Sequence, residues 1–304
     1  MSRPAPRLIE LEDGVLDSRT GLAWAVNAGL SEFPLTWTEA LDFVHNLNND
    51  AYLGHHDWKL PNRRELFSLM SHKHINPSLP AGHPFINVFP GYYWTSTTCA
   101  RLPDQAWYIH LGGAKVYKGM KRQSYMVWPV RIPDSERLTL LPTGQTSCYD
   151  AEGKMVRCAG TGQDGEFQAG NSIDAARFQS QQDVVRDTAT GLTWLQSANP
   201  SGSMVDWNAA IAWIDRMNQN HAHGYDDWRL PDIRELESLI HMDAHTPALP
   251  PDHPFTDIQE FYWSATRSMY DTRYAWALYT RDGYIGVGHK PQAECYIWPV
   301  RGPA

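Results

Sequence analysis

A repeat with a fixed offset is the feature that most constrains how this chain folds. Thr-Gly-Leu-Ala-Trp at 20–24 returns as Thr-Gly-Leu-Thr-Trp at 190–194, an offset of 170 residues. The same offset carries Asp-Trp-Lys-Leu-Pro at 57–61 to Asp-Trp-Arg-Leu-Pro at 227–231. Of the 13 tryptophans, only Trp213 has no counterpart in the other copy. A repeat of this length indicates a duplicated globular domain rather than a solenoid of short units.

The repeat predicts two domains, at 8–133 and 183–303, joined by a linker at 134–182. This linker is rich in Gly, Ser, Thr and Gln, as connecting segments usually are. Within it, Cys148 and Cys158 flank a turn at Gly153, so we expect a hairpin whose cysteines form a disulfide in an oxidising compartment. The alternative is two free thiols. Cys99 and Cys295 lack counterparts, and we expect them to be buried or free rather than paired.

Each copy is expected to contain two helices followed by an antiparallel meander, which makes an α+β domain. Thr36 and Glu39 have the spacing of a capping box before an amphipathic helix, and Asp206 takes the capping position in the second copy. Asn62 with Glu65, and Asp232 with Glu235, predict the second helix. Aromatic and β-branched residues favour strands over 92–97, 105–110, 114–118 and 125–131.

Composition excludes several classes of function. The formal net charge is -8, and no run of five like charges occurs, so we do not expect nucleic-acid or anionic-membrane binding. No apolar stretch approaches the roughly 18 residues needed to span a bilayer. No signal peptide is visible at the start of the sequence, so localisation is not predicted. The oligomeric state is not predicted either.

The repeated motifs resemble those of the Lcl C-terminal domain family, also known as domain of unknown function 1566. They are Thr-Gly-Leu-x-Trp, Asp-Trp-[Lys/Arg]-Leu-Pro-x-x-x-Glu-Leu, Tyr-Trp-[Ser/Thr]-[Ser/Ala]-Thr and a closing Val-Arg. The resemblance implies a C-type-lectin-like fold related to formylglycine-generating enzymes, and a secreted or cell-surface binding module. One such relative recognises sulfated polysaccharide, and others are variable proteins of diversity-generating retroelements.

We therefore expect a non-enzymatic, adhesin-like protein that binds a polysaccharide or protein through loops of the meander, where the copies differ. Tyr and Arg dominate binding hot spots, and they are frequent here. The alternative is an ordinary sheet with one solvated face. Candidates in the second copy are Tyr270, Arg273, Tyr274, Tyr279, Arg281, Tyr284, His289 and Lys290. Candidates in the first copy are Tyr108, His110, Tyr117, Lys118, Lys121 and Arg122, with Arg101 and Tyr125 nearby.

Lysines and an arginine in the first copy suggest a basic patch for an acidic polymer such as a sulfated glycan. They are Lys115, Lys118, Lys121 and Arg122. On this interpretation, replacing Lys118, Lys121 and Arg122 together by alanine weakens binding to such a glycan.

An oxidoreductase related to the formylglycine-generating enzymes is the rival hypothesis. It requires two neighbouring cysteines late in a domain, whereas Cys295 stands alone there. Glu65 and Glu235 have a capping role, and no phosphate-binding loop or hydrolase motif occurs, so we predict no catalytic residues. No metal or other cofactor is expected, because the histidine pairs lack a matching second pair. A structural calcium ion is compatible with a lectin-like fold, although its Glu-Pro-Asn and Trp-Asn-Asp motifs are absent.

Overall fold

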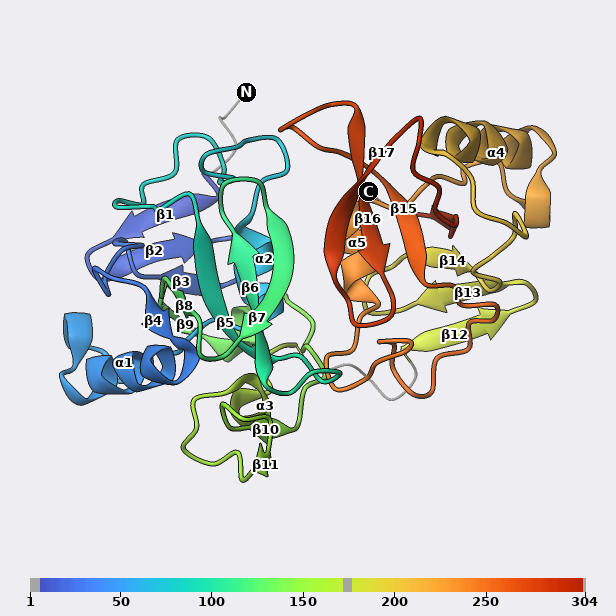
Figure 1. Ribbon diagram of the computed structural model, residues 1–304. Coiled ribbons are helices and arrows are strands. Elements are labelled where there is room, and N and C mark those ends of the chain that lie inside the picture. The colour runs from blue at the N-terminus through green and yellow to red at the C-terminus, as the bar shows by residue number, and fades with distance from the viewer. Residues whose placement is uncertain (1–5, 172–176, 303–304) are drawn as a thin grey trace. The chain divides into compact units, whose positions relative to one another are not determined.

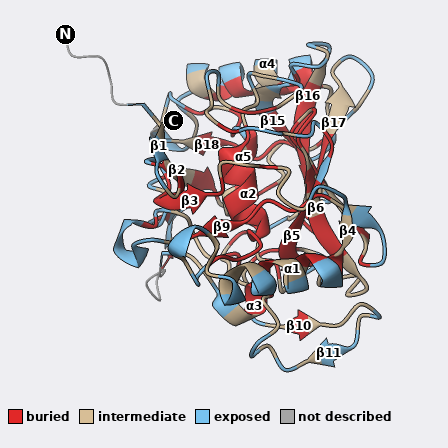
Figure 2. Cartoon of the chain, turned by 90° about the vertical axis from the view of Figure 1, so that its left-hand side faces the viewer, coloured by how far each residue is buried: buried red, intermediate tan, exposed pale blue. Residues whose placement is uncertain are grey.

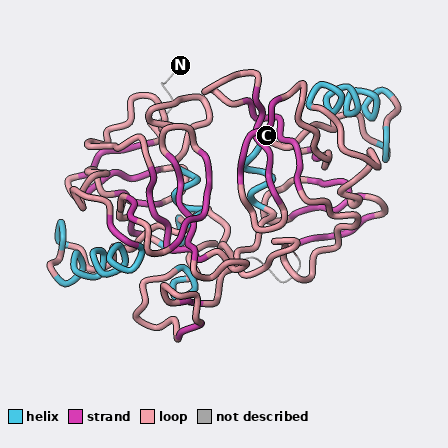
Figure 3. The backbone as a smooth tube through the Cα atoms, viewed as in Figure 1, coloured by secondary structure: helices cyan, strands magenta, loops and turns pink. Residues whose placement is uncertain are grey.

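The computed structural model describes residues 6–171 and 177–302 of the chain. The chain forms two compact units, Met1–Ser172 and Ile173–Ala304. In each unit, a sheet of short strands, two α-helices and a meander of longer strands follow the same order along the chain (Figure 1). Figure 3 shows that strands and loops make up most of both units. The chain is therefore α+β with two repeated halves, as the sequence predicts.

The first unit is built on two antiparallel layers of strands. Four short strands form a sheet in the order β1-β2-β3-β9, with bounds Leu8–Leu11, Gly14–Asp17, Leu22–Trp24 and Val130–Arg131. The meander consists of β5 (Tyr92–Thr98), β6 (Gln105–His110) and β7 (Lys115–Met120). The short strands β4 (Leu35–Thr36) and β8 (Ser124–Tyr125) pair with each other. The helices that the first unit shares with the second are α1 (Trp37–Asn49) and α2 (Arg63–Leu69), and η1 (Tyr52–Gly54) lies between them.

The second unit repeats this arrangement. Its short-stranded sheet has the order β12-β13-β14-β18, with bounds Phe178–Gln181, Val184–Asp187, Thr193–Leu195 and Val300–Arg301. Its meander consists of β15 (Phe261–Arg267), β16 (Tyr274–Tyr279) and β17 (Ile285–His289). Its helices are α4 (Trp207–Gln219), η3 (Ala222–Gly224) and α5 (Ile233–Ser238).

The helices begin where the sequence predicts their caps. The Thr36 hydroxyl accepts from the Glu39 N–H, and the Glu39 carboxylate accepts from the Thr36 N–H at 2.8 Å. Asn62 with Glu65 forms the same reciprocal cap at α2, and Asp232 with Glu235 forms it at α5. All seven residues of α2 are buried, whereas α1 is buried on one face only (Figure 2). The capping predictions are thus confirmed.

The paired tryptophans form the same core in both units. The rings of Trp24 and Trp128 lie 5.5 Å apart, and those of Trp194 and Trp298 also lie 5.5 Å apart. All four side chains are fully buried. The Trp128 indole N–H donates to the Ala25 carbonyl, and Trp298 donates in the same way to Leu195. The indole N–H groups of Trp24 and Trp194 have no hydrogen-bond partner among the described residues, so packing alone holds these two rings, whereas packing and a hydrogen bond hold Trp128 and Trp298.

The closing strand differs from the prediction of one strand over 125–131. The chain forms β8 at Ser124–Tyr125 and β9 at Val130–Arg131, and these strands belong to different sheets. Pro129 lies between them. Proline has no N–H to donate to a strand ladder, so pairing is interrupted there and the chain passes from one sheet to the other.

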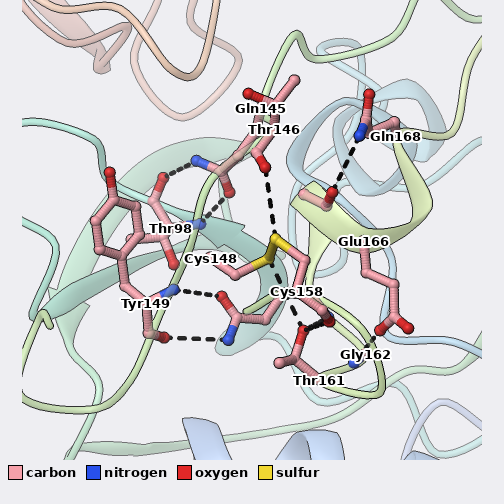
Figure 4. Close-up of a disulfide and its surroundings, with 12 residues drawn as sticks. Thr98, Gln145, Thr146, Cys148, Tyr149, Cys158, Thr161, Gly162, Glu166 and Gln168 are labelled. Carbon is pink, nitrogen blue, oxygen red and sulfur yellow. Dashed lines mark hydrogen bonds between the residues drawn. A yellow bond between two sulfur atoms is a disulfide. The ribbon is translucent and has the colours of Figure 1, made fainter. Parts of the chain in front are cut away.

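The segment predicted to be a linker has structure of its own. After η2 (Ser135–Arg137), it forms β10 (Cys148–Tyr149), β11 (Met155–Val156) and α3 (Asp164–Phe167), and a disulfide joins Cys148 to Cys158 (Figure 4). We call residues 138–171 the docked segment. They belong to the first unit, and the Asn171 N–H donates to the Leu140 carbonyl at 2.6 Å. The docked segment is therefore a long loop whose two ends are joined by a hydrogen bond.

Candidate binding face

The meander of the first unit has two chemically distinct faces. Tyr108 lies opposite Tyr117, and Trp107 lies opposite Lys118 in the next register position. Because side chains alternate along a strand, the two tyrosines point to one face and Trp107 with Lys118 to the other. The Arg63 guanidinium of α2 lies 4.8 Å from the Trp107 ring centre. The Trp107 face is therefore the face that packs against α2.

Four tyrosines cover the opposite face. The Tyr108 ring lies 4.5 Å from Tyr125, 5.2 Å from Tyr92 and 5.7 Å from Tyr117. They come from β5, β6, β7 and β8, so the fold rather than the local sequence brings them together. We call Tyr92, Tyr108, Tyr117 and Tyr125 the tyrosine face. Tyr92 is 43% exposed, and the other three are half-buried.

Gly119 makes room for this cluster. A Cβ atom at Gly119 would lie 2.7 Å from the Gln123 amide oxygen, 2.9 Å from the Tyr125 hydroxyl and 3.0 Å from the Tyr108 ring. These distances are shorter than van der Waals contact, so a larger residue would displace the rings. The Tyr125 hydroxyl donates to the same Gln123 oxygen at 3.0 Å. The position of Tyr125 is thus set by packing and by a hydrogen bond.

The tyrosine face is largely uncharged at neutral pH. Burial raises the pKa of Tyr108 and of Tyr125. Burial, followed by the nearby Lys115 ammonium, lowers the pKa of His110, whose ring lies 4.9 Å from Tyr92. Lys115 Nζ lies 6.0 Å from the Tyr117 ring centre. These shifts keep Tyr108, Tyr125 and His110 neutral at neutral pH, and Lys115 supplies one cation at the edge of the face.

The predicted basic residues of the first copy do not form one patch. Lys118 lies on the Trp107 face, with its Nζ 5.3 Å from that ring. Lys121 is only 1% exposed and donates to the carbonyls of Tyr149 and Asp150, at 2.9 and 3.0 Å. Burial lowers the pKa of Lys121 to about 7. Arg122 is exposed. Lys121 therefore binds the docked segment and is not available to a ligand. This corrects the expectation that Lys118, Lys121 and Arg122 together form one glycan site.

The candidate residues of the second copy lie in separate groups. The ring of Tyr274 is 5.0 Å from His289, and the ring of Tyr279 is 5.0 Å from Tyr284. Tyr274 and Tyr279 are five positions apart on β16, so they point to opposite faces. The remaining candidates are held by other contacts or exposed on the loop after β15. Arg273 pairs with Asp271, Arg281 pairs with Glu260, Lys290 donates to the Thr272 carbonyl, and Tyr270 is 74% exposed.

The counterpart of the tyrosine face in the second unit is made of different residues. The strand registers place Phe261, Ala277, Gly286 and Cys295 at the positions of Tyr92, Tyr108, Tyr117 and Tyr125. A Cβ atom at the neighbouring Gly288 would lie 2.4 Å from the Trp263 ring, so that ring covers the strand directly. Three of the four phenol positions therefore carry Ala, Gly or Cys, and Phe261 holds the fourth. The Phe261 ring lies 5.4 Å from Tyr279, whose ring lies 5.0 Å from Tyr284, so the aromatic side chains on this face occupy other positions than in the first unit.

Sequence reasoning found three of the four tyrosines but omitted Tyr92. The signal was present, because Tyr92 and Trp94 alternate with Tyr93 at the strand period of two. The buried Tyr93 hydroxyl accepts from the Phe89 N–H, whereas Tyr92 points to the tyrosine face. The pairing register between β5 and β6 shows which of Tyr92 and Tyr93 lies on the tyrosine face, and the sequence alone does not give this register.

Within 6–171 and 177–302, no three His, Cys, Asp or Glu side chains lie close enough together to hold a metal ion. In the same ranges, every helix is too short or too polar to cross a bilayer.

Comparison with known sequences gives the family. Comparison with curated proteins finds no match. The family model described as Lcl C-terminal domain matches residues 13–131 and again 183–301, which together are more than half of the chain. Both matches contain the paired tryptophans and the helix caps described above. The chain therefore belongs to the Lcl C-terminal domain family and carries two tandem copies of that domain.

Proposed function

We propose that this protein is a non-enzymatic binding protein with C-type-lectin-like domains, and that its first copy binds a polysaccharide through the tyrosine face. The observation that carries the proposal is the contiguity of four phenol rings on one side of the meander. Large, rigid aromatic side chains give contact area with little loss of conformational entropy. A cluster of them is therefore suited to recognition.

The chemistry of the face favours a sugar chain. Phenol rings offer a flat apolar surface to the C–H groups of a sugar, and their hydroxyls hydrogen-bond to its oxygens. Lys115 at the edge suits a sulfate or carboxylate group on that sugar. A protein surface that inserts a hydrophobic side chain is the second partner class that such a face accepts.

The environments of the cysteines and glutamates support a binding role over the oxidoreductase alternative. Cys99 and Cys295 lie in different units, and both are buried. Burial raises the pKa of Cys295 to about 12, which disfavours the thiolate that a metal or a nucleophilic step requires. Glu65 pairs with Lys59 and caps α2, and Glu235 pairs with Arg229 and caps α5. These glutamates already have structural partners.

A glycan array probed with the full chain and with Tyr92→Ala tests the proposal. Tyr92 is the most exposed tyrosine of the face, so its replacement removes a binding ring at little cost in folding. We expect signals on the bound glycans to fall about tenfold, the effect of losing one interface hot spot of roughly 1.4 kcal/mol. Tyr270→Ala, at an exposed tyrosine of the other copy, is the matched control. Equal signals for the chain and Tyr92→Ala, or a loss with Tyr270→Ala alone, would contradict the proposal.

A further inference from the structure

The docked segment shows how a loop of defined chemistry binds to one copy of this domain. The Thr97 hydroxyl donates to the Asp164 carboxylate at 2.6 Å, and the Arg64 guanidinium donates to the Pro142 carbonyl at 2.5 Å. Lys121 holds the carbonyls of the hairpin, as described above. Together with Lys59 and Trp37, these side chains form what we call the seat of the first copy.

Backbone groups extend the seat along the edge of β5. The Gln145 side chain donates to the Thr98 carbonyl and accepts from its N–H, both at 2.8 Å (Figure 4). The turn at Gly153 packs against residues 103 and 104 of the loop between β5 and β6. A hollow of about 390 Å³ is left between α1 and the end of the docked segment. The contacts are therefore polar and directional rather than a general apolar collapse.

The second copy keeps the same residue at four of the five seat positions and a different cation at the fifth. Arg234, Thr266, Lys290, Arg229 and Trp207 correspond to Arg64, Thr97, Lys121, Lys59 and Trp37. Local geometry confirms the correspondence. The Thr97 hydroxyl accepts from the Arg63 N–H at 2.9 Å, and the Thr266 hydroxyl accepts from the Ile233 N–H at 3.0 Å. Lys121 and Lys290 both lie over a tryptophan ring, at 4.0 and 4.5 Å.

The seat of the second copy is more exposed than that of the first. Thr97 and Thr98 are fully buried, whereas Thr266 is half-buried and Arg267 is exposed. The difference is largest on the loop against which the Gly153 turn packs in the first copy. The corresponding loop of the second copy presents Met269 and Tyr270, at 48% and 74% exposure. Exposed apolar side chains at this position indicate a surface suited to a partner.

We infer that the seat of the second copy binds a partner protein that presents a disulfide-closed, glycine-rich loop carrying an aspartate. The aspartate accepts from the Thr266 hydroxyl as Asp164 does from Thr97, and the loop turn covers Met269 and Tyr270. In the first copy, the docked segment of the same chain occupies the seat. In the second copy, the loop of the partner protein takes that place. This surface is in the second copy and the tyrosine face is in the first, so the failure of one proposal would not contradict the other.

The chain's own segment is the probe for this interaction. We would label an oxidised synthetic peptide of residues 141–171 and measure its binding to the full chain by fluorescence anisotropy. The expected result is saturable binding of one peptide per chain, weakened about tenfold by Thr266→Val and retained by Thr266→Ser. Thr188→Val, at an exposed threonine of the same unit, is the matched control and should leave binding unchanged.

Several outcomes would overturn the inference. They are the absence of saturable binding, binding that Thr266→Val leaves unchanged, and equal binding by a peptide with Asp164→Asn. Concentration-dependent dimerisation of the chain without peptide, abolished by Thr266→Val, would replace the partner loop by a second copy of this chain. Thr266→Val also removes the hydroxyl that accepts from the Ile233 N–H. The Asp164→Asn peptide, measured on the unchanged chain, therefore separates loss of the contact from loss of this hydrogen bond at the start of α5.

Discussion

The two copies share a core and differ on one face of the meander. The ring pair Trp24 and Trp128 is reproduced by Trp194 and Trp298 at the same distance, with interplanar angles of 62° and 61°. On the outer face, by contrast, three of the four phenol positions of the first copy carry Ala277, Gly286 and Cys295, and Phe261 holds the fourth. The positions that fix packing were preserved after duplication, while the face that we propose binds a ligand diverged.

The copies also differ in how far a shared ion pair is buried. Lys59 and Glu65 have side chains that are 6% and 2% exposed, and Lys59 Nζ lies 5.7 Å from the ring centre of Phe167 in the docked segment. The equivalent Arg229 and Glu235 are 29% and 12% exposed. The same motif therefore has a buried pair beside the docked segment in one copy and a partly solvated pair in the other.

The largest expected effect tests whether the two cores are equivalent. Trp128→Ala and Trp298→Ala should each lower the free energy of unfolding of the unit that carries it by about 3–5 kcal/mol, because each leaves a large cavity. Calorimetry of the two variants measures this directly. A copy that tolerated the substitution would show that its tryptophan is not part of an equivalent core.

A smaller effect concerns pH and only the first unit. Burial raises the pKa of Asp164 to about 6 from 3.8. The folded chain thus holds this proton more tightly than the unfolded chain. The resulting stabilisation is fully present below about pH 4 and is lost as pH rises through about 6. This group should lower the free energy of unfolding by roughly 3 kcal/mol between pH 4 and 7.

Urea unfolding of the chain and of Asp164→Asn across this range checks the pH prediction. The variant has no carboxyl to titrate at this position, so its stability should vary less with pH. Identical pH profiles for the two proteins would show that Asp164 is not the group responsible. The second unit has no docked segment among residues 177–302 and supplies an internal comparison.

The smallest expected effect separates the basic residues of the first copy. Lys115→Ala should lower retention on a heparin column slightly, because this cation lies at the edge of the tyrosine face. Lys121→Ala should instead destabilise the first unit by roughly 1–3 kcal/mol, because it leaves the Tyr149 and Asp150 carbonyls without their donor. A large loss of retention with Lys121→Ala and unchanged stability would restore the basic patch inferred from sequence.

The sequence predicts the parts of the fold that depend on local chemistry. The capping residues Thr36, Asn62 and Asp232 satisfy backbone groups within three positions, so spacing alone identifies them. The paired tryptophans are recognised because the repeat supplies a second copy to compare. The short sheet of β1, β2 and β3 was not predicted, because strands of three or four residues are too short for a clear alternation.

The candidate site depends on information that is not local. Lys118 and Lys121 are three residues apart in sequence, yet one lies over Trp107 and the other is buried beneath the docked segment. The polar composition of 138–171 predicts a linker, whereas its contacts with Arg64, Thr97 and Lys121 come from residues far away in the chain. Strand register and long-range hydrogen bonds determine where the two lysines lie and how residues 138–171 pack. The spacing of residues along the sequence predicts neither.

Isothermal titration of the full chain with the glycan that gives the strongest array signal tests the central comparison most directly. If the copies share a core and only the first presents the tyrosine face, the chain binds one equivalent of glycan, and Tyr92→Ala weakens that single site. Two equivalents per chain, or one equivalent unaffected by Tyr92→Ala, would contradict this account.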